Sequence, residues 1–403
     1  MNKLLLAVML GVALAANSGA CVAAPDEALL DAARRHEAPL LATLKELVLI
    51  ESGSSDAAGL ARMGDYAERR LKELGAAVER KDGIVTARFK GTGVRKLMLM
   101  AHMDTVYQPG ILATQPYRVD GKRVYGPGIA DDKSGIALIL HTLALLRSAG
   151  WRDYAQLTVV FNSDEEIGSR ASGDWIAMQA GEHDFVFSCE PHGAPLDGIL
   201  LSASGIATAT MTVQGRAAHA GVAAKAGRNA LIELSHQLLQ TKDIEVPGTQ
   251  LNWTRANVGM VTNQIPASAT ALGDVRLSAP DGVQRLQQAL REKVATPLVS
   301  DTVTTVELKA GRPPYLATAA GRAWAAKAQG IYAEIGRELA LYPGSGGGTD
   351  AGYASRSGKA IVLESFGLGG EGVHGNDEYI TLDSVLPRLY LLSRMLQEAG
   401  ASR

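Results

Sequence analysis

Cysteine is scarce in this chain of 403 residues, which contains two, Cys21 and Cys189. Removal of the segment around Cys21, for which the reasons follow, leaves Cys189 alone, so we expect no internal disulfide in the mature chain. Hydrophobic residues make up 46% of the sequence, which is ample for packed cores. Because the chain is longer than the size at which one hydrophobic core stops growing, its length favours two domains.

An excess of charge of either sign is also missing. Lys and Arg number 40 against 42 for Asp and Glu, which gives a formal net charge of −2. This balance gives no indication of binding to nucleic acid or to an anionic membrane surface. Beyond the N-terminus, no apolar run is long and uninterrupted enough for a membrane helix, so we expect no membrane span.

The first 24 residues have the pattern of a secretory signal peptide. Lys3 precedes an apolar run over residues 4–16, and small residues follow. The run is too short to span a bilayer, and the pattern predicts cleavage after Ala24 and an exported, periplasmic protein. A lipoprotein signal at Cys21 is the less favoured alternative, because Ser18 stands where the usual lipobox has Leu.

The larger part of the sequence alternates helical and strand patterns. Helical spacing of leucines and a long apolar stretch predict helices, and short β-branched or apolar runs predict strands. This alternation favours an α/β domain with a mixed central sheet flanked by helices. In chain order the expected elements are helices over 25–75, strands over 78–89 and 96–100, a helix over 134–149, strands over 156–161 and 185–188, a helix over 317–335, a strand over 360–363 and a closing helix from Asp383.

The middle of the chain has a different pattern and interrupts the first domain. Its elements follow the order βαββαβ, which is the split pattern of a ferredoxin-like α+β domain. We therefore predict an inserted domain over residues 204–313, with Pro313-Pro314 as the return linker. The other boundaries are a signal peptide over 1–24 and a catalytic domain in two parts, 25–203 and 314–403. The expected elements of the insert are strands over 206–214, 252–260, 269–277 and 302–308, and helices over 227–241 and 281–295.

A short loop, Gly126-Pro127-Gly128-Ile129-Ala130-Asp131-Asp132-Lys133, joins glycines, adjacent carboxylates and a lysine at the start of a long apolar helix. Such an Asp-Asp pair is usually a helix cap. Other strand ends, however, also carry a His or Glu, and polar residues at the C-terminal ends of strands are where open α/β sheets place their sites. We therefore predict that Asp131 is shared between two metal ions, in company with His102, Glu165, Glu166, Glu190 and His374.

The chemistry of a two-metal hydrolytic site explains these residue types. The ions lie about 3.5–4 Å apart, so a bridging carboxylate fits between them. His102 can bind one metal, while Asp104 can hold its other imidazole nitrogen. Because Glu165 and Glu166 are adjacent, one can bind metal while the other stays free as a general base. Each residue alone is more often an ordinary strand end or turn residue, so their joint occurrence carries the prediction.

Six segments, given at the end of this paragraph, closely resemble those of the bacterial glutamate carboxypeptidases (the carboxypeptidase G group). These enzymes belong to the co-catalytic zinc peptidase family with acetylornithine deacetylase, succinyl-diaminopimelate desuccinylase, aminoacylase and carnosinase. The resemblance covers nearly the whole mature chain, in order. The segments are Ala101-His102-Met103-Asp104-Thr105-Val106-Tyr107, the loop ending at Lys133, Asn162-Ser163-Asp164-Glu165-Glu166, Ser188-Cys189-Glu190-Pro191, Ala218-His219-Ala220-Gly221 and Gly346-Gly347-Gly348-Thr349-Asp350.

The resemblance implies two zinc ions per subunit and a division of the ligands between them. Glu165 would be the general base, and the peptide bond between Asp131 and Asp132 would be cis. A cis bond without proline costs about 3–4 kcal/mol, so only the resemblance supports that expectation. The implied ligands are His102 and Glu190 for one ion, Glu166 and His374 for the other, and Asp131 for both.

The resemblance also implies roles for residues outside the metal ligands. His219 of the inserted domain would reach the active site of the partner subunit and steady the tetrahedral oxyanion, which implies a homodimer. Arg276 would grip the terminal carboxylate of the substrate with its planar guanidinium. Asn263 and Gly348 would contribute to substrate binding.

The implied reaction is hydrolysis of the amide bond before a C-terminal amino acid, in a small molecule or short peptide with a free carboxylate. Family substrates are N-acyl amino acids, including folate-type compounds. Residues 191–198 and 342–345 contain no Lys or Arg for a glutamate side chain, so a broader or more apolar preference stays open. The alternatives are an N-acyl-amino-acid deacylase or dipeptidase, and a catalytically silent amino-acid-binding relative. Retention of Glu165 and all five candidate ligands disfavours the silent relative.

Overall fold

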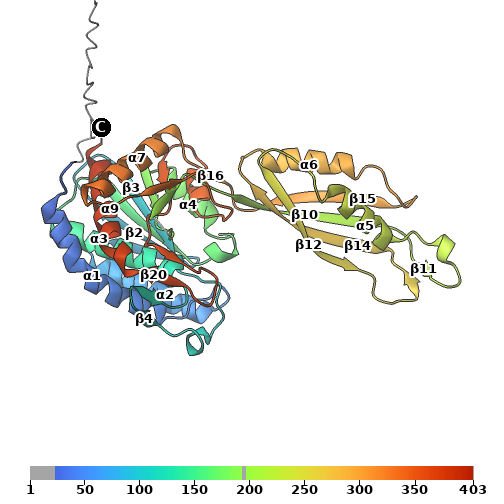
Figure 1. Cartoon of the computed structure of the whole chain (residues 1–403), viewed down its shortest axis with the longest axis horizontal. Helices are drawn as coiled ribbons and strands as arrows, with labels where there is room; N and C mark the ends of the chain where they lie inside the picture. The colour runs from blue at the N-terminus through green and yellow to red at the C-terminus, as the bar shows by residue number, and fades with distance from the viewer. Residues whose placement is uncertain (1–22, 193–196, 403) are drawn as a thin grey trace, which may run out of the picture.

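The computed structural model describes residues 23–192 and 197–402, which form a larger and a smaller lobe (Figure 1). The larger lobe contains both ends of the described chain, and the smaller lobe is a continuous insert in the middle of the sequence. Among the described residues, no helix has the length and apolar character needed to cross a membrane. The signal peptide predicted for residues 1–24 and the alternative at Cys21 fall almost wholly outside the described residues.

A six-stranded mixed sheet forms the centre of the larger lobe. Its strand order is β1-β2-β6-β3-β7-β18, and the last four of these strands run parallel to one another. The C-terminal ends of those four strands therefore meet at one edge, as the sequence predicts. The strands are β1 (Ala77–Lys81), β2 (Ile84–Lys90), β3 (Lys96–His102), β6 (Gln156–Asn162), β7 (Phe185–Ser188) and β18 (Ile361–Leu363).

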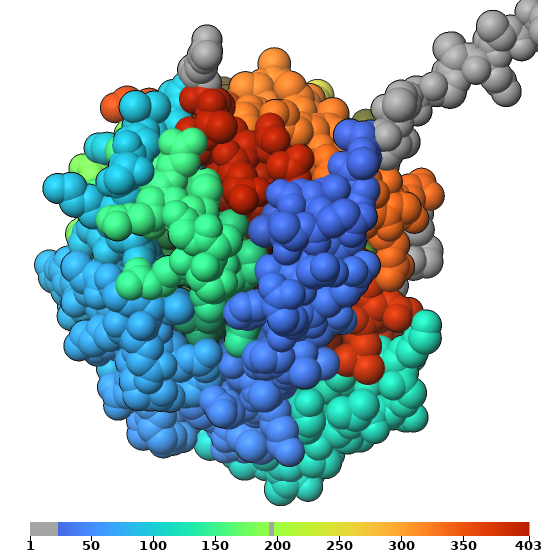
Figure 2. Space-filling view, turned by 90° about the vertical axis from the view of Figure 1, so that its left-hand side faces the viewer, coloured from blue at the N-terminus to red at the C-terminus, as the bar shows by residue number. Residues whose placement is uncertain are grey.

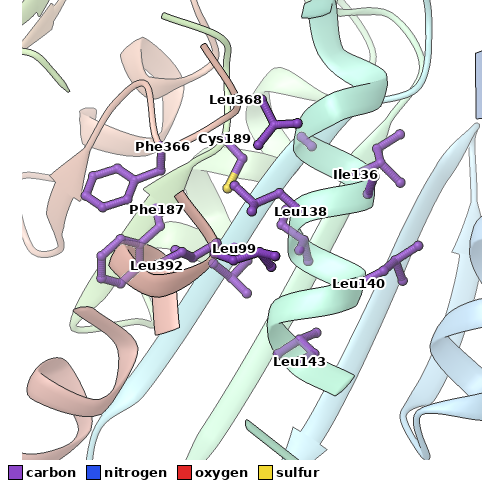
Figure 3. Packing of buried hydrophobic residues seen from close by; sticks show 14 of the residues in the cluster. Leu99, Ile136, Leu138, Leu140, Leu143, Phe187, Cys189, Phe366, Leu368 and Leu392 are labelled. Carbon is purple, nitrogen blue, oxygen red and sulfur yellow. The ribbon is translucent and has the colours of Figure 1, made fainter. Parts of the chain in front are cut away.

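Helices cover both faces of this sheet, and the most apolar of them, α3, is buried along most of its length. Figure 3 shows Leu138 of α3 packed beside Leu99 of β3 and near Leu392 of α9. At the surface, Figure 2 shows the N-terminal α1 lying against the C-terminal segments, where the backbone N–H of Asp26 donates to the Tyr390 hydroxyl at 2.9 Å. One face carries α1 (Glu27–Val48), α2 (Ala57–Glu73), α3 (Ser134–Ser148), α7 (Ala319–Glu334) and α9 (Leu382–Ala401), and the other carries α4 (Gly173–Ala180) and α8 (Ala351–Ser355).

The smaller lobe is a four-stranded sheet with two helices on one face, and it has a hydrophobic core of its own. The strand order is β12-β14-β10-β15, with every neighbouring pair antiparallel. This arrangement agrees with the predicted βαββαβ order, while the predicted domain boundaries stay a prediction. The elements are β10 (Gly205–Gln214), α5 (Ala230–Thr241), β12 (Thr249–Val258), β14 (Ser268–Leu277), α6 (Gly282–Lys293) and β15 (Val303–Ala310).

Two features differ from the sequence-based expectations. The single strand predicted over 78–89 is wrong: β1 and β2 form a hairpin. Asp82 and Gly83 form its turn with φ of 51° and 78°, and a positive φ at both positions is what a type I′ hairpin turn requires. Several short strands were also not predicted, because two or three residues are too few to show an alternation of polar and apolar positions. They are β4 (Arg118–Asp120), β5 (Arg123–Tyr125), β19 (Gly370–Glu371) and β20 (Tyr379–Thr381) in one sheet, and the pairs β8 (Gly198–Leu200) with β17 (Ala340–Tyr342), β9 (Ser202–Ala203) with β16 (Tyr315–Leu316), and β11 (Ala218–His219) with β13 (Gln264–Ile265).

The sheet of short strands matters for the site. Antiparallel pairing of β5 with β20 places residues 123–125 beside 379–381. The loop that follows β5 leads to Asp131, and the loop that precedes β20 carries His374. Two segments about 250 positions apart in the chain are thereby held side by side at the sheet edge.

A buried histidine in α3 gives a testable pH dependence of stability. His141 Nε2 lies 2.9 Å from Thr43 Oγ1, and its Nδ1 lies 3.2 Å from His36 Nδ1. Burial, with the nearby His36 and Arg70, lowers the pKa of His141 to about 4. As pH falls from about 6.5 to about 4, the unfolded chain binds the proton first, so the folded state loses stability over that range.

We therefore expect the His141→Gln variant to have a flatter pH profile in metal-free protein. Between pH 7 and pH 5, wild type should lose about 2 kcal/mol more free energy of unfolding than the variant. Urea unfolding at several pH values measures this difference. A His236→Gln variant on α5 serves as the control, and its free energy of unfolding should depend on pH as that of wild type does. The same pH dependence in His141→Gln and wild type would contradict a lowered pKa of His141 in the folded protein.

Candidate functional site

The predicted strand ends do bring their polar residues together. His102 is the last residue of β3, and Glu190 comes two residues after β7. Glu165 and Glu166 lie in a single 3-10 turn that follows β6. Asp131 lies in the loop before α3, and its peptide bond to Asp132 is cis, as the family resemblance implied.

Asp131 stands between the two histidines. Its Oδ1 is 2.8 Å from His102 Nε2, and its Oδ2 is 3.3 Å from His374 Nε2. Glu190 Oε1 lies 3.7 Å from His102 Nε2, and Glu166 Oε2 lies 3.1 Å from His374 Nε2. The residues thus form two groups of potential metal ligands, and within each group one ligand atom per residue lies within 4.8 Å of the others. Asp131 belongs to both groups.

The electrostatics of the cluster favour a bound cation. Burial, only partly opposed by His102, raises the pKa of Glu190 to about 7. Hydrogen bonds to Asp131 and Glu166 raise the pKa of His374 to about 10. Despite burial, the neighbouring carboxylates also raise the pKa of His102. In the metal-free protein, protons on the two histidines therefore partly offset the negative charge of the carboxylates, and a metal ion can take the place of these protons. Imidazole and carboxylate are ligands that zinc binds readily, so the donor set fits that metal.

Asp104 supports the cluster in two ways, one of them unexpected. His102 Nδ1 lies 3.0 Å from the Asp104 carbonyl oxygen and 3.3 Å from its Oδ1, which agrees with the expected contact to the second imidazole nitrogen. The Asp104 carboxylate also accepts from the backbone N–H groups of Glu165 and Glu166, both at 3.1 Å. One carboxylate therefore orients His102 and fixes the turn that carries both glutamates.

Glu165 is paired with an arginine that sequence reasoning missed. Arg312 donates to the Glu165 carboxylate and carbonyl, and to the Gly348 carbonyl at 2.7 Å. Both side chains are buried. Burial raises the pKa of Glu165 well above its ordinary value, and the Arg312 charge opposes that rise. Arg312 comes directly before the predicted Pro313-Pro314 linker, but nothing local in the sequence marks it as a site residue.

A second missed residue, Glu378, organises the loop of Asp131. Its carboxylate accepts from the backbone N–H groups of Gly128, Ala130 and Asp131 at 2.9, 2.8 and 2.9 Å. It also accepts from the Tyr107 hydroxyl at 2.7 Å. One buried carboxylate thus satisfies three backbone donors of the loop, and only the folded chain brings it there from the opposite end of the sequence.

A cavity of about 1000 Å³ opens over the cluster between the two lobes. Two predicted substrate-binding residues line it. Arg276 of β14 donates to Asp274 and, at 3.2 Å, to the Gly346 carbonyl. Gly348 needs to be glycine, because a Cβ there would lie 2.8 Å from the Ser204 carbonyl oxygen.

The other two predicted residues lie elsewhere in this chain. His219 is in β11, at the tip of the smaller lobe far from the cluster (Figure 1). Its Nδ1 accepts from the backbone N–H groups of Gly221 and Val222, both at 3.1 Å. Asn263 is its neighbour, since its carbonyl accepts from Ala220 at 2.9 Å. The structure therefore groups His219 with Asn263 and separates both from the cavity of the same chain.

Comparison with known proteins agrees with this geometry. Residues 98–398 match the model of peptidase family M20/M25/M40. The chain is 42% identical to carboxypeptidase G2 from Pseudomonas sp. (strain RS-16) over 389 residues, which is 94% of this chain and 93% of that enzyme. It is 27% identical to succinyl-diaminopimelate desuccinylase from Methylorubrum populi over 332 residues, 77% of this chain and 84% of the relative.

Solved structures share the fold at low sequence identity. A tripeptidase from Staphylococcus aureus aligns with a TM-score of 0.73 at 20% identity, over 91% of this chain and 99% of that one. The M20 family metallo-carboxypeptidase Sso-CP2 from Sulfolobus solfataricus aligns with a TM-score of 0.71 at 17% identity, over 90% and 99% of the two chains. The fold, the family match and the identity over nearly the whole length agree: this chain is a metallopeptidase of the M20/M25/M40 family.

Proposed function

We propose that this protein is an exported, zinc-dependent carboxypeptidase that cleaves the amide bond before a C-terminal amino acid. The observation that carries the proposal is the pair of ligand groups that share Asp131, with the buried Glu165 beside them. The 42% identity to carboxypeptidase G2 supports the same class of reaction. Its substrates would be N-acyl amino acids or short peptides with a free carboxylate, folate-type compounds included.

Two zinc ions would be held by the five clustered residues. His102 and Glu190 would bind one ion, Glu166 and His374 the other, and Asp131 both. When bound, zinc polarises the scissile carbonyl and makes water a better nucleophile at neutral pH. Asp104 orients His102 through Nδ1, which is how carboxylates outside the ligand set fix the imidazole tautomer.

Glu165 would act as the general base. Its turn follows β6 at the edge of the cluster, and Glu165 belongs to neither group of potential metal ligands, so its carboxylate stays free to take up and return a proton. It would remove the proton from the attacking water and deliver a proton to the leaving amine. Arg312 would keep the Glu165 carboxylate in place through its contacts with the carboxylate and the carbonyl of that residue.

Substrate binding would use residues of both lobes. Arg276 lines the cavity and would bind the terminal carboxylate, with Gly348 allowing close approach of the substrate to the backbone. His219 and Asn263 would act in the active site of a partner subunit, where His219 would stabilise the oxyanion. Both residues lie at the tip of the smaller lobe, far from the cavity of their own chain. This position is compatible with a homodimer, in which the tip of one subunit would reach the cavity of the other.

Substitution of the proposed base gives the first test of mechanism. Glu165→Gln keeps the size of the side chain but removes the proton acceptor, so kcat should fall by about 10²–10⁴-fold. The zinc content should stay at the wild-type level, because Glu165 belongs to neither ligand group. Steady-state hydrolysis of an N-acyl amino acid and metal analysis of the same preparation measure both quantities.

A Glu182→Gln variant is the matched control, because Glu182 is exposed and lies outside the cavity lining. It should keep wild-type kcat and zinc content. Near-normal turnover by Glu165→Gln would refute the base assignment, and loss of zinc from that variant would show that Glu165 is a ligand instead.

Glu378 gives a second test, directed at the loop that carries Asp131. In Glu378→Gln, an amide nitrogen that donates and cannot accept replaces one of the two carboxylate oxygens, so at least one of the three hydrogen bonds from the backbone N–H groups is lost. The loop then holds Asp131 less firmly, and we expect zinc affinity to fall by about 10–100-fold. Competition with a chelator of known affinity measures this change.

The neighbouring Asp377→Asn variant serves as the control, because the Asp377 side chain is 86% exposed. Its zinc affinity should equal that of wild type. Unchanged affinity in Glu378→Gln would mean that the loop keeps its conformation without this carboxylate.

A further inference from the structure

The guanidinium groups that line the cavity already have partners among the described residues. Among the described lining residues, two carry guanidinium groups: Arg276 and Arg312. Arg276 is paired with Asp274 at 2.8 Å, and the proposed mechanism uses it for the terminal carboxylate of the substrate. Arg312 is paired with the Glu165 carboxylate. Neither arginine is left to bind a second carboxylate on the substrate side chain.

One wall of the cavity is aromatic and aliphatic. The rings of His192 and Tyr342 meet edge to face, with centroids 4.2 Å apart and planes at 71°. Leu200, the strand partner of Tyr342, and Ile206 also line the cavity. We call these four residues the ring wall.

The backbone holds the ring wall in place. Tyr342 pairs with Leu200 in the parallel ladder of β17 with β8. The Tyr342 ring packs directly on Gly198, where a Cβ would lie 2.2 Å from its Cε2 and 2.8 Å from His192 Cδ2. Position 198 can therefore carry no side chain of its own while the two rings keep this arrangement.

A carboxylate, Glu371, adds a negative charge to the lining of the cavity. Glu371 lines the cavity, is exposed, and accepts from the Tyr379 hydroxyl at 2.6 Å. A carboxylate on the substrate side chain would meet this charge and would lose water without gaining a cation, which is unfavourable. An apolar side chain gives up no hydrogen bonds to water when it enters the cavity, and burial of its surface against the ring wall is favourable.

We propose that the ring wall selects substrates whose C-terminal residue is aromatic or aliphatic, so the preferred substrates are N-acylated apolar amino acids rather than N-acylated glutamate. This inference rests on the proposed carboxypeptidase function and specifies its substrate class. Tyr342 and His192 determine specificity and take no part in the chemical step.

The test compares four substrates with the same acyl group and C-terminal phenylalanine, leucine, alanine or glutamate, using the full-length zinc-loaded enzyme. We expect kcat/KM for the phenylalanine and leucine substrates to exceed that for glutamate by about tenfold or more. Glutamate turnover equal to or above these would overturn the inference and leave the proposed function intact. Failure to hydrolyse any of the four would overturn the proposed function, and the inference with it.

Tyr342→Ala tests the ring wall itself. The ratio of kcat/KM for the phenylalanine substrate to that for the alanine substrate should fall by about tenfold, mainly through KM for phenylalanine. A ratio taken within one preparation does not depend on how much of the variant is folded. His236→Ala, outside the cavity lining, should keep the wild-type ratio. An unchanged ratio in Tyr342→Ala would overturn the role of the ring wall.

Discussion

The arrangement of the whole site depends on one carboxylate, Asp131, which is placed between two imidazoles. Its two oxygens face His102 and His374, which come from distant parts of the chain. Holding a buried carboxylate there requires compensation, since a buried charge without a partner is costly. The histidines provide it in the metal-free protein, and Glu378 adds a fixed backbone around the loop by accepting three of its N–H groups. The short strands β5 and β20 bring the two loops together.

A second constraint links the lobes to the chemistry. Arg312 lies where the chain returns from the smaller lobe, yet its guanidinium reaches Glu165 and the Gly348 carbonyl in the cavity. Arg276 makes a similar connection from β14 to the glycine-rich loop. Since both arginines cross between the lobes, the position of the smaller lobe affects the proposed base and the proposed carboxylate site together. The shape of the cavity therefore depends on the orientation of the two lobes.

Much of this arrangement could be predicted from sequence because it depends on local patterns. Apolar runs that end in His or Glu located β3, β6 and β7, and the parallel sheet then brought those ends to one edge. The βαββαβ order of the insert was readable for the same reason. Asp104 was expected near His102, but its bonds to the turn at Glu165 depend on strand alignment that no local pattern shows.

The residues that sequence reasoning missed act through tertiary contacts. Glu378 and Arg312 are single charged residues without a motif, and their roles arise only when loops distant in sequence meet. The short strands β5 and β20 were not predicted, because three residues are too few to show an alternation of polar and apolar side chains. The turn at Asp82-Gly83 did carry a local signal, since Asp-Gly between two apolar runs is typical of a hairpin.

The central claim is that Asp131 bridges two metal ions, and a crystal structure of the zinc-loaded protein, measured at the zinc absorption edge, tests it most directly. The account predicts two anomalous peaks about 3.5–4 Å apart, with one Asp131 oxygen bound to each ion. His102 and Glu190 should complete one site, and Glu166 and His374 the other. A single peak, or two peaks without Asp131 between them, would contradict the account.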